Sequence, residues 1–168
     1  MLRFEVLDKS VFEKLSRCIF AILAHNMTAI APTGNSYEED YIGWNTAVSE
    51  GLQKEARSIV LIYFGDDLIG FFQYYANPEG VLMMEEIQIS PDYQGKGYGI
   101  FRELYRFLFS ILPADIKSVE AYANKNNQKS QDILHHLDLQ IIGENKNGNS
   151  FHYRGDFDNL KKWYYSKP

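Results

Sequence analysis

Six consecutive residues, Gln94-Gly95-Lys96-Gly97-Tyr98-Gly99, contain three alternating glycines and one lysine. Glycine lets the backbone approach a ligand closely and adopt conformations that other residues avoid. When such a turn precedes a helix, its amides point into one concavity at the positive end of the helix dipole. Phosphate oxygens bind in such concavities, and the Lys96 ammonium adds a charge for a second phosphate. The turn therefore predicts a phosphate-binding site.

Three other interpretations of this turn are weaker. A dinucleotide fingerprint requires Gly-x-Gly-x-x-Gly after the first strand of a βαβ unit, and here the third glycine comes one residue early. A nucleotide-hydrolase phosphate loop requires Gly-Lys followed by Ser or Thr, which is absent at Lys96. A tight strand-to-helix connection without a ligand does not require three glycines and a lysine.

The elements around the turn follow from hydrophobic periodicity. The order β-α-α-β-β-β-α-β-α-β-β excludes an ordinary doubly wound sheet, which alternates strand and helix from the start. The helix after the turn implies a parallel crossover within an otherwise antiparallel sheet. We expect strands over 2–7, 58–64, 68–75, 81–89, 119–123, 141–144 and 151–154, helices over 11–22, 37–48, 100–112 and 127–137, and a tail over 160–165 that is apolar on one side.

Local signals refine several boundaries. Ser10 with Glu13, and Ser36 with Glu39, fit the capping box that begins a helix. Asn147-Gly148 predicts a hairpin in which both turn positions have positive φ. Cys18 lies in the first expected helix, where we expect it to be a core residue.

Composition limits the class of protein. The chain has 168 residues, 45% of them hydrophobic and 23% charged, which predicts a single globular domain over 1–168. The net charge of −5 argues against nucleic acid as a partner and mildly favours a cationic substrate. One cysteine permits no internal disulfide or multi-cysteine metal site. With no signal-peptide region or apolar span, we expect a cytoplasmic protein that binds no membrane.

The sequence before and within the turn resembles a known family. Gln94-x-x-Gly97-x-Gly99 matches the acetyl-CoA signature of the GCN5-related N-acetyltransferases (GNAT), and Ile87-Gln88-Ile89-Ser90-Pro91-Asp92-Tyr93 looks like the strand and proline turn that precede it. The element order resembles that fold along nearly the whole chain. The resemblance implies an α+β fold with a twisted, mostly antiparallel central sheet of about seven strands, splayed after the fourth strand, and helices on both faces.

The resemblance also implies how acetyl-CoA is bound, as a co-substrate and without a metal. Amides of the turn would hold the pyrophosphate, and backbone groups of Ile87 and Ile89 would pair with the pantetheine arm like an added strand. Asn127 fits the family asparagine that contacts this arm, although a helix N-cap explains it equally well. The implied cofactor-binding residues are Ile87, Gln88, Ile89, Gln94, Gly95, Lys96, Gly97, Tyr98, Gly99, Asn127 and Ser130.

The sequence departs from the family pattern at Leu134. Many relatives have a tyrosine here that protonates the departing thiolate, and leucine cannot do so. Unassisted departure is tolerable because a thiol has a pKa near ~8.5. Tyr122 and Tyr153 are alternative donors, although each is more typical of a packed strand aromatic. His135 and His136 are expected to be surface residues.

Two carboxylates on the strand before the turn are the candidate catalytic bases. An amine with a lysine-like pKa of ~10.4 must lose a proton before it attacks a thioester, and a carboxylate can accept that proton directly or through water. Successive strand residues point to opposite faces, so Glu86 shares a face with Gln88, and Glu85 shares one with Ile89. We favour Glu86, with Glu85 as the alternative. Both carboxylates facing solvent is the remaining possibility.

The predicted function is transfer of an acetyl group from acetyl-CoA to a primary amine of a small molecule or peptide, by direct attack. A non-catalytic acyl-CoA-binding or regulatory module is the alternative, and Leu134 is the feature that favours it. The loops 25–35 and 145–149 are expected to border the acceptor pocket, because such loops set specificity on a shared scaffold. The apolar tail packs on the domain or on a second copy, so a homodimer is possible.

Overall fold

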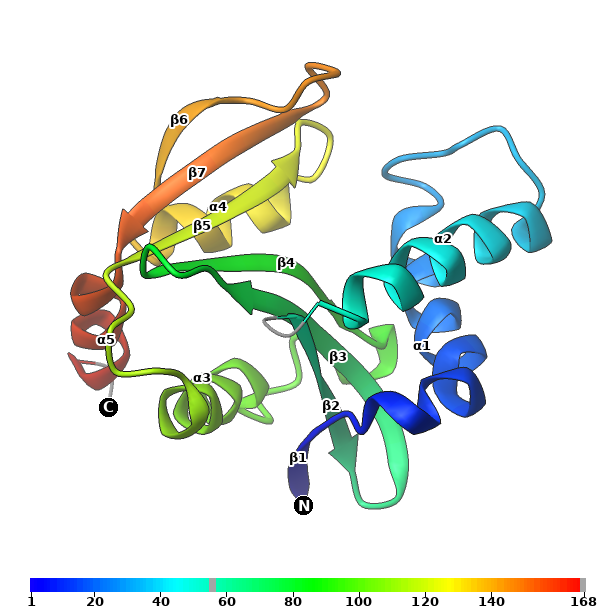
Figure 1. Ribbon diagram of the computed structural model, residues 1–168, viewed down its shortest axis with the longest axis horizontal. Helices are drawn as coiled ribbons and strands as arrows, with labels where there is room; N and C mark the ends of the chain where they lie inside the picture. Colours follow the sequence, from blue (N-terminus) through cyan, green and yellow to red (C-terminus); the bar gives the residue numbers. More distant parts are fainter. Residues whose placement is uncertain (55–56, 167–168) are drawn as a thin grey trace. The chain divides into compact units, whose positions relative to one another are not determined.

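The computed structural model describes residues 1–54 and 57–166, and within them it contains one sheet of seven strands and five α-helices. The strand order is β1-β2-β3-β4-β5-β7-β6 (Figure 1). This confirms the predicted α+β class. The strands are β1 Leu2–Val6, β2 Arg57–Phe64, β3 Asp67–Ala76, β4 Val81–Ile89, β5 Ser118–Asn124, β6 Gln140–Glu144 and β7 Ser150–Asp156; the helices are α1 Phe12–Met27, α2 Tyr37–Leu52, α3 Ile100–Ile111, α4 Gln128–His136 and α5 Phe157–Ser166.

Pairing in the sheet is antiparallel between β1 and β2, between β5 and β7, and between β6 and β7. The neighbours β4 and β5 are parallel, as expected for two strands joined through helix α3. Their ladder runs from Val81↔Ser118 to Met84↔Ala121, although β4 continues to Ile89. Only the first part of β4 is therefore paired with β5 in this ladder.

The chain forms two compact units, which are described in turn. Unit 1 consists of Met1–Tyr74 and Glu86–Ile100. Unit 2 consists of Tyr75–Glu85 and Phe101–Pro168. The glycine turn belongs to unit 1, and the expected asparagine and leucine positions of helix α4 belong to unit 2.

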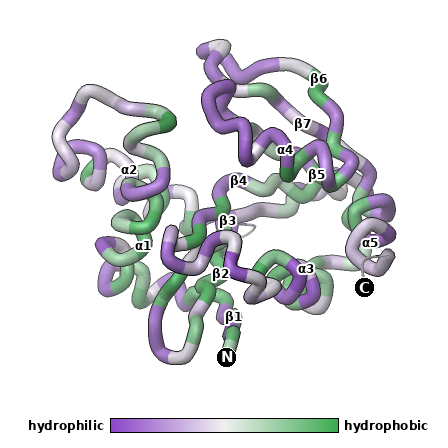
Figure 2. Tube along the Cα trace, turned by 180° about the vertical axis from the view of Figure 1, so that it is seen from behind, coloured by the Kyte–Doolittle hydropathy of each residue, from purple (hydrophilic) through white to green (hydrophobic). Residues whose placement is uncertain are grey.

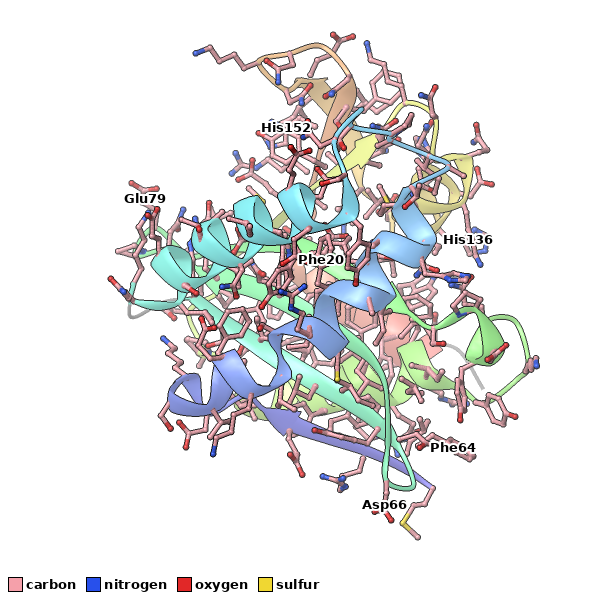
Figure 3. The ribbon with its side chains drawn as sticks, turned by 90° about the vertical axis from the view of Figure 1, so that its right-hand side faces the viewer. Phe20, Phe64, Asp66, Glu79, His136 and His152 are labelled. Carbon is pink, nitrogen blue, oxygen red and sulfur yellow. The ribbon has the colours of Figure 1, made fainter. Side chains whose placement is uncertain are left out.

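In unit 1, helices α1 and α2 lie side by side against β2 and β3 (Figure 1). Phe20 of α1 points toward α2, where its ring centroid lies 5.5 Å from that of Tyr41 and 5.3 Å from that of Trp44 (Figure 3). The apolar face of each helix has a period of 3.6 residues, while β2 contributes alternate residues. The buried residues of this core are Leu7, Phe12, Ile19, Val48, Leu52, Ile59, Leu61 and Phe71.

The start of helix α1 differs from the prediction. Asp8, not Ser10, caps a short 3₁₀ turn over Lys9–Val11, and its Oδ1 accepts bonds from the Ser10 amide at 3.0 Å and the Ser10 hydroxyl at 2.8 Å. The Ser10 hydroxyl therefore donates to Asp8 and does not cap helix α1. Helix α1 begins at Phe12 without a side-chain cap. Helix α2 starts with the predicted capping box between Ser36 and Glu39.

Helix α1 also differs from the prediction at its outer face and its end. Cys18 is exposed, because the helical period directs the neighbouring Ile19 into the core instead. The helix runs to Met27, five residues beyond the expected end, and so carries His25 and Asn26 in its last turn. The connection to α2 is correspondingly shorter than the predicted loop.

In unit 2, alternate residues of β5 are buried, and helices α4 and α5 pack against β5 and β7. The apolar tail is helix α5, in which Leu160 and Tyr164 are buried. Arg106 of α3 donates to the Tyr164 hydroxyl at 3.0 Å, and Phe109 of α3 packs edge-on against the Tyr164 ring at 5.4 Å. The tail therefore packs against the rest of unit 2.

The β6–β7 hairpin differs from the two-residue turn that was expected. Asn145 donates its amide to Ser150 O at 3.0 Å, so four residues form the loop. Gly148 has a φ of +70°, whereas Asn147 does not have a positive φ, which corrects the prediction. A four-residue loop built on an ordinary turn requires the left-handed conformation at one position only. Figure 2 shows the tip of this hairpin as hydrophilic and part of β6 as hydrophobic.

No helix within residues 1–54 and 57–166 is long and apolar enough to cross a membrane.

Candidate functional site

The backbone of β4 contains one extra residue relative to β3. Asn77 donates its amide to Val81 O at 2.9 Å, and Ser90 donates to Ile69 O at 2.7 Å. Between these two bonds β3 advances eight residues and β4 advances nine. This mismatch defines a β-bulge, a feature that changes the direction of side chains along a strand.

Burial along β4 locates the bulge after Met84. Leu82 and Met84 are buried at the spacing of two that a regular strand gives, but Gln88 and Ile89 are buried consecutively. Simple alternation therefore does not hold throughout the segment between Met84 and Ile89. The assignment of Glu85 to the face of Ile89 rested on that alternation, and the bulge removes its basis.

The glycine turn adopts the conformation that its sequence predicts. Gly95, Gly97 and Gly99 have φ values of +67°, +74° and +69°, and helix α3 begins at the next residue. A Cβ placed on any of these three glycines would have no heavy atom within 4 Å. Glycine is thus required here for its left-handed backbone, and space lies open beside the turn. Alternating left-handed residues before a helix form an anion-binding arrangement of amides.

An aromatic cluster anchors the turn. The ring centroid of Tyr98 lies 5.0 Å from that of Phe64 and 5.9 Å from that of Tyr93, and the Phe64 and Tyr93 centroids are 5.6 Å apart. Phe64 is the last residue of β2, close to the hairpin that carries Asp66 (Figure 3). The Tyr98 side chain therefore packs against the rings of Phe64 and Tyr93.

Asn26, near the end of helix α1, joins this helix to β4 and the turn. Its Nδ2 donates to Gln88 Oε1 at 2.8 Å and to Ile89 O at 2.8 Å. Gln94 Nε2 donates to the same Ile89 oxygen at 2.7 Å and, over a longer 3.4 Å, to Asn26 Oδ1. Gln94 is therefore fixed to the end of β4, and it forms the first residue of the turn.

Glu86 is held by the same set of side chains. Gln88, which is 8% exposed, donates its Nε2 to Glu86 Oε1 at 2.6 Å. This bond confirms that Glu86 and Gln88 share one face of β4. A partly buried carboxylate, oriented by an amide donor, can accept a proton from a nucleophile or from an ordered water.

Glycine is also required where β3 passes β4. A Cβ on Gly70 would lie 2.6 Å from Gln88 O and 2.8 Å from the Ile89 side chain. The two strands thus approach too closely for any other residue at this position. Gly70 therefore lies directly against the part of β4 that carries Gln88 and Ile89.

Unit 2 contains the remaining residues implied by the resemblance. Asn127 is the N-cap of helix α4, and its Oδ1 accepts a bond from the Ser130 amide at 3.1 Å. The cap prediction is therefore confirmed. Leu134 is 7% exposed and faces the core, where a phenol would need a polar partner.

The two tyrosines considered as proton donors lie in different surroundings. Tyr153 is fully buried, its hydroxyl is 3.3 Å from His135 Nε2, and burial raises its pKa, all of which fit a packed aromatic. Tyr122 is 45% exposed and its ring stacks on His152, with centroids 4.4 Å apart. His152 Nε2 in turn lies 2.7 Å from Glu120 Oε1. Of the two phenols, Tyr122 is the accessible one.

Two cavities lie in unit 2. One of about 570 Å³ is lined by residues of both charges at the start of β5 and the end of β7. The other, about 260 Å³, is apolar and lies among α3, α4 and α5, with exposed His136 on its wall. Among residues 1–54 and 57–166, no three His, Cys, Asp or Glu side chains are grouped as metal ligands.

No motif marked Asn26, Phe64 or Gly70 individually, although Asn26 falls within the loop 25–35 that was expected to border the acceptor pocket. An asparagine in the last turn of a helix and a phenylalanine at the end of a strand have no motif of their own. Asn26 and Gln88 are 62 residues apart in sequence, so only the folded chain brings them together.

Comparison with known protein families matches residues 18–137 to the acetyltransferase (GNAT) family. Among solved structures, an acetyltransferase from Thermus thermophilus has a TM-score of 0.70 at 15% identity, covering 93% of this chain and 97% of that one. The PaiA N-acetyltransferase from Thermoplasma acidophilum, in complex with coenzyme A, has a TM-score of 0.71 at 12% identity and coverage of 93% and 99%.

The spermidine N-acetyltransferase from Vibrio cholerae, in complex with CoA and spermine, has a TM-score of 0.62 at 14% identity, covering 95% of this chain and 98% of that one. At these identities the structural likeness concerns the fold. No curated protein matches the chain in sequence.

Proposed function

Because the chain belongs to the GNAT family of acetyltransferases, we propose that it transfers an acetyl group from acetyl-CoA to a primary amine. The observation that carries this proposal is the glycine turn, with three left-handed glycines and open space beside each of them. Such a turn binds a pyrophosphate through backbone amides, with the Lys96 ammonium as an added charge.

The pantetheine arm would extend from the turn along β4. The ladder between β4 and β5 ends at Met84, and the backbone beyond it includes Ile87 and Ile89. The Ile89 carbonyl already accepts bonds from Asn26 and Gln94, so we assign the contacts with the arm to the Ile89 amide and to Ile87. Asn127, the N-cap of α4, and Ser130, within α4, remain proposed contacts of the cofactor.

Glu86 is the proposed base. It would accept a proton from the amine, directly or through water, as the amine nitrogen attacks the carbonyl carbon of the thioester. The carbon–sulfur bond then breaks and coenzyme A leaves as a thiolate that takes up a proton. No covalent enzyme intermediate forms. With leucine at position 134, the thiolate leaves unassisted or takes its proton from Tyr122, the more exposed of the two candidate tyrosines.

A small-molecule amine is the proposed acceptor. The Vibrio cholerae neighbour is a spermidine N-acetyltransferase, which supports polyamines as the first compounds to test. The net charge of −5 is compatible with a cationic acceptor. Amines of peptides are the second class of acceptor to test.

Release of free thiol from acetyl-CoA tests the proposal. The intact protein is incubated with acetyl-CoA and, separately, with polyamines, amino acids, aminoglycosides and peptide N-termini. We expect amine-dependent release with at least one class, and mass spectrometry should show the acceptor heavier by one acetyl group. Thiol release that is independent of amine would indicate hydrolysis and contradict the proposal.

The second candidate is a non-catalytic acyl-CoA-binding module, and Leu134 favours it because the usual proton donor is missing. Calorimetry separates the two candidates. Acetyl-CoA binding without thiol release in the full amine panel would support the module, whereas turnover would exclude it.

A further inference from the structure

Four side chains in unit 1 form one directed chain of hydrogen bonds. Gln94 donates to Asn26, Asn26 donates to Gln88, and Gln88 donates to Glu86, over 3.4, 2.8 and 2.6 Å. The chain starts at the first residue of the glycine turn and ends on the proposed base. It crosses from the turn to helix α1 and back to β4.

The direction of this chain is set at its Glu86 end. An ionised carboxylate can only accept hydrogen bonds, so Gln88 must present its Nε2 to Glu86. The Gln88 Oε1 then faces Asn26, so Asn26 must present its Nδ2 to Gln88. The Asn26 Oδ1 is thereby directed toward Gln94. Asn26 and Gln88 each use both the donor end and the acceptor end of their amide along this path, whereas Gln94 uses its donor end.

We propose that Asn26 is a positioning residue, which fixes the Glu86 carboxylate through Gln88 and couples it to the cofactor turn through Gln94. The catalytic part of this inference rests on the proposed function. The hydrogen-bond coupling of Asn26 to Glu86 can be measured in the free protein without any substrate. Asn26 also lies two residues before the connection to α2. The chain therefore ties the start of that connection to β4.

Asn26→Asp tests the donor direction with almost no change of shape. The introduced carboxylate can still accept a bond from Gln94, but it cannot donate to Gln88 or to Ile89 O. To satisfy this carboxylate, Gln88 must turn its amide and present Oε1 to Glu86, which places two acceptors in contact. We expect the melting temperature to fall by roughly 3–8 °C.

Glu86→Gln should rescue this variant. The introduced amide can donate to Gln88 Oε1, and Gln88 Nε2 can then donate to the carboxylate on α1. These two bonds reverse their direction, while Gln94 continues to donate to that carboxylate. In the double variant we expect about half or more of the lost melting temperature to return, while Glu86→Gln alone changes it little. This non-additivity measures the coupling without any substrate.

Asn45→Asp is the matched control. Asn45 also donates a hydrogen bond through its Nδ2, to Glu13 Oε1 at 3.4 Å, but it lies on helix α2 and outside the chain of hydrogen bonds. Its effect on melting temperature should be the same in the wild-type and Glu86→Gln backgrounds. Equal losses for Asn26→Asp in both backgrounds would overturn the coupling. If Asn26→Asp fails to fold, folding of the double variant supports the proposal, and failure of both overturns it.

Kinetics give the second readout. With an acceptor amine from the thiol-release panel, Asn26→Asp should lower kcat by about tenfold or more, because a misplaced base loses its alignment with the amine. The KM for acetyl-CoA should stay within about threefold, because the Gln94 contact is retained. An unchanged kcat would exclude the positioning role. A wild-type protein that transfers no acetyl group but shows the rescue would contradict the proposed function alone.

Discussion

The ring of Tyr98, in the middle of the glycine turn, packs on the ring of Phe64 at the end of β2, with centroids 5.0 Å apart. Tyr93 completes a cluster of three rings. A glycine-rich segment has high conformational entropy when it is free. We therefore expect the contact with Phe64 to reduce the conformational freedom of the turn before a ligand binds.

Phe64→Ala should weaken acetyl-CoA binding although Phe64 is not a predicted ligand. Without the ring, the turn must be ordered at the time of binding, and we expect the Kd, measured by calorimetry, to rise about 3–10-fold. Tyr63→Ala is the control, because this neighbouring residue packs beside the helical core of unit 1. An equal rise in Kd for Tyr63→Ala would point to general destabilisation.

Gly97→Asp should abolish much of the cofactor affinity. The substitution strains a left-handed backbone and places a negative charge beside the proposed pyrophosphate site. The Kd for acetyl-CoA should rise at least tenfold, about 1.4 kcal/mol. Gly34→Asp is the control, since Gly34 also has positive φ and open space around it. A folded Gly97→Asp protein with unchanged affinity would show that the pyrophosphate binds elsewhere.

Glu86→Gln keeps the shape of the side chain and removes its basicity. The acetyl-transfer step should slow by roughly 10²–10⁴-fold, with little change in acetyl-CoA affinity. The loss should shrink as pH rises toward the amine pKa of ~10.4, where the nucleophile needs no base. Rates are measured by thiol release across pH.

Glu85→Gln is the control for this experiment, because both carboxylates lie in the segment of β4 that contains the bulge. If Glu85→Gln slows transfer and Glu86→Gln does not, the two roles are exchanged. Full turnover of Glu86→Gln at neutral pH would remove Glu86 from the mechanism.

Leu160→Ala should destabilise unit 2, because Leu160 is fully buried in helix α5. A buried Leu→Ala change costs about 2–5 kcal/mol, which corresponds to a fall in melting temperature of roughly 5–15 °C. Lys162→Ala, on the exposed side of the same helix, is the control and should have little effect. Similar melting temperatures for both variants would mean that α5 is not packed in solution.

Much of the fold and part of the site follow from local sequence patterns. The strand and helix order, the Ser36 capping box, the Asn127 cap and the left-handed glycines depend on residues within a few positions of one another. The pairing of Glu86 with Gln88 on one face follows from the two-residue period of a strand. Such features require no knowledge of what packs against them.

Tertiary structure decided which distant groups meet. The register between β3 and β4 requires one extra residue in β4, and no local pattern marks it. Asn26 binds Gln88 because helix α1 packs over the sheet and continues past its expected end. The sequence determines periods and caps because these are short-range, whereas the partner of a buried polar group is fixed only when the chain closes around it.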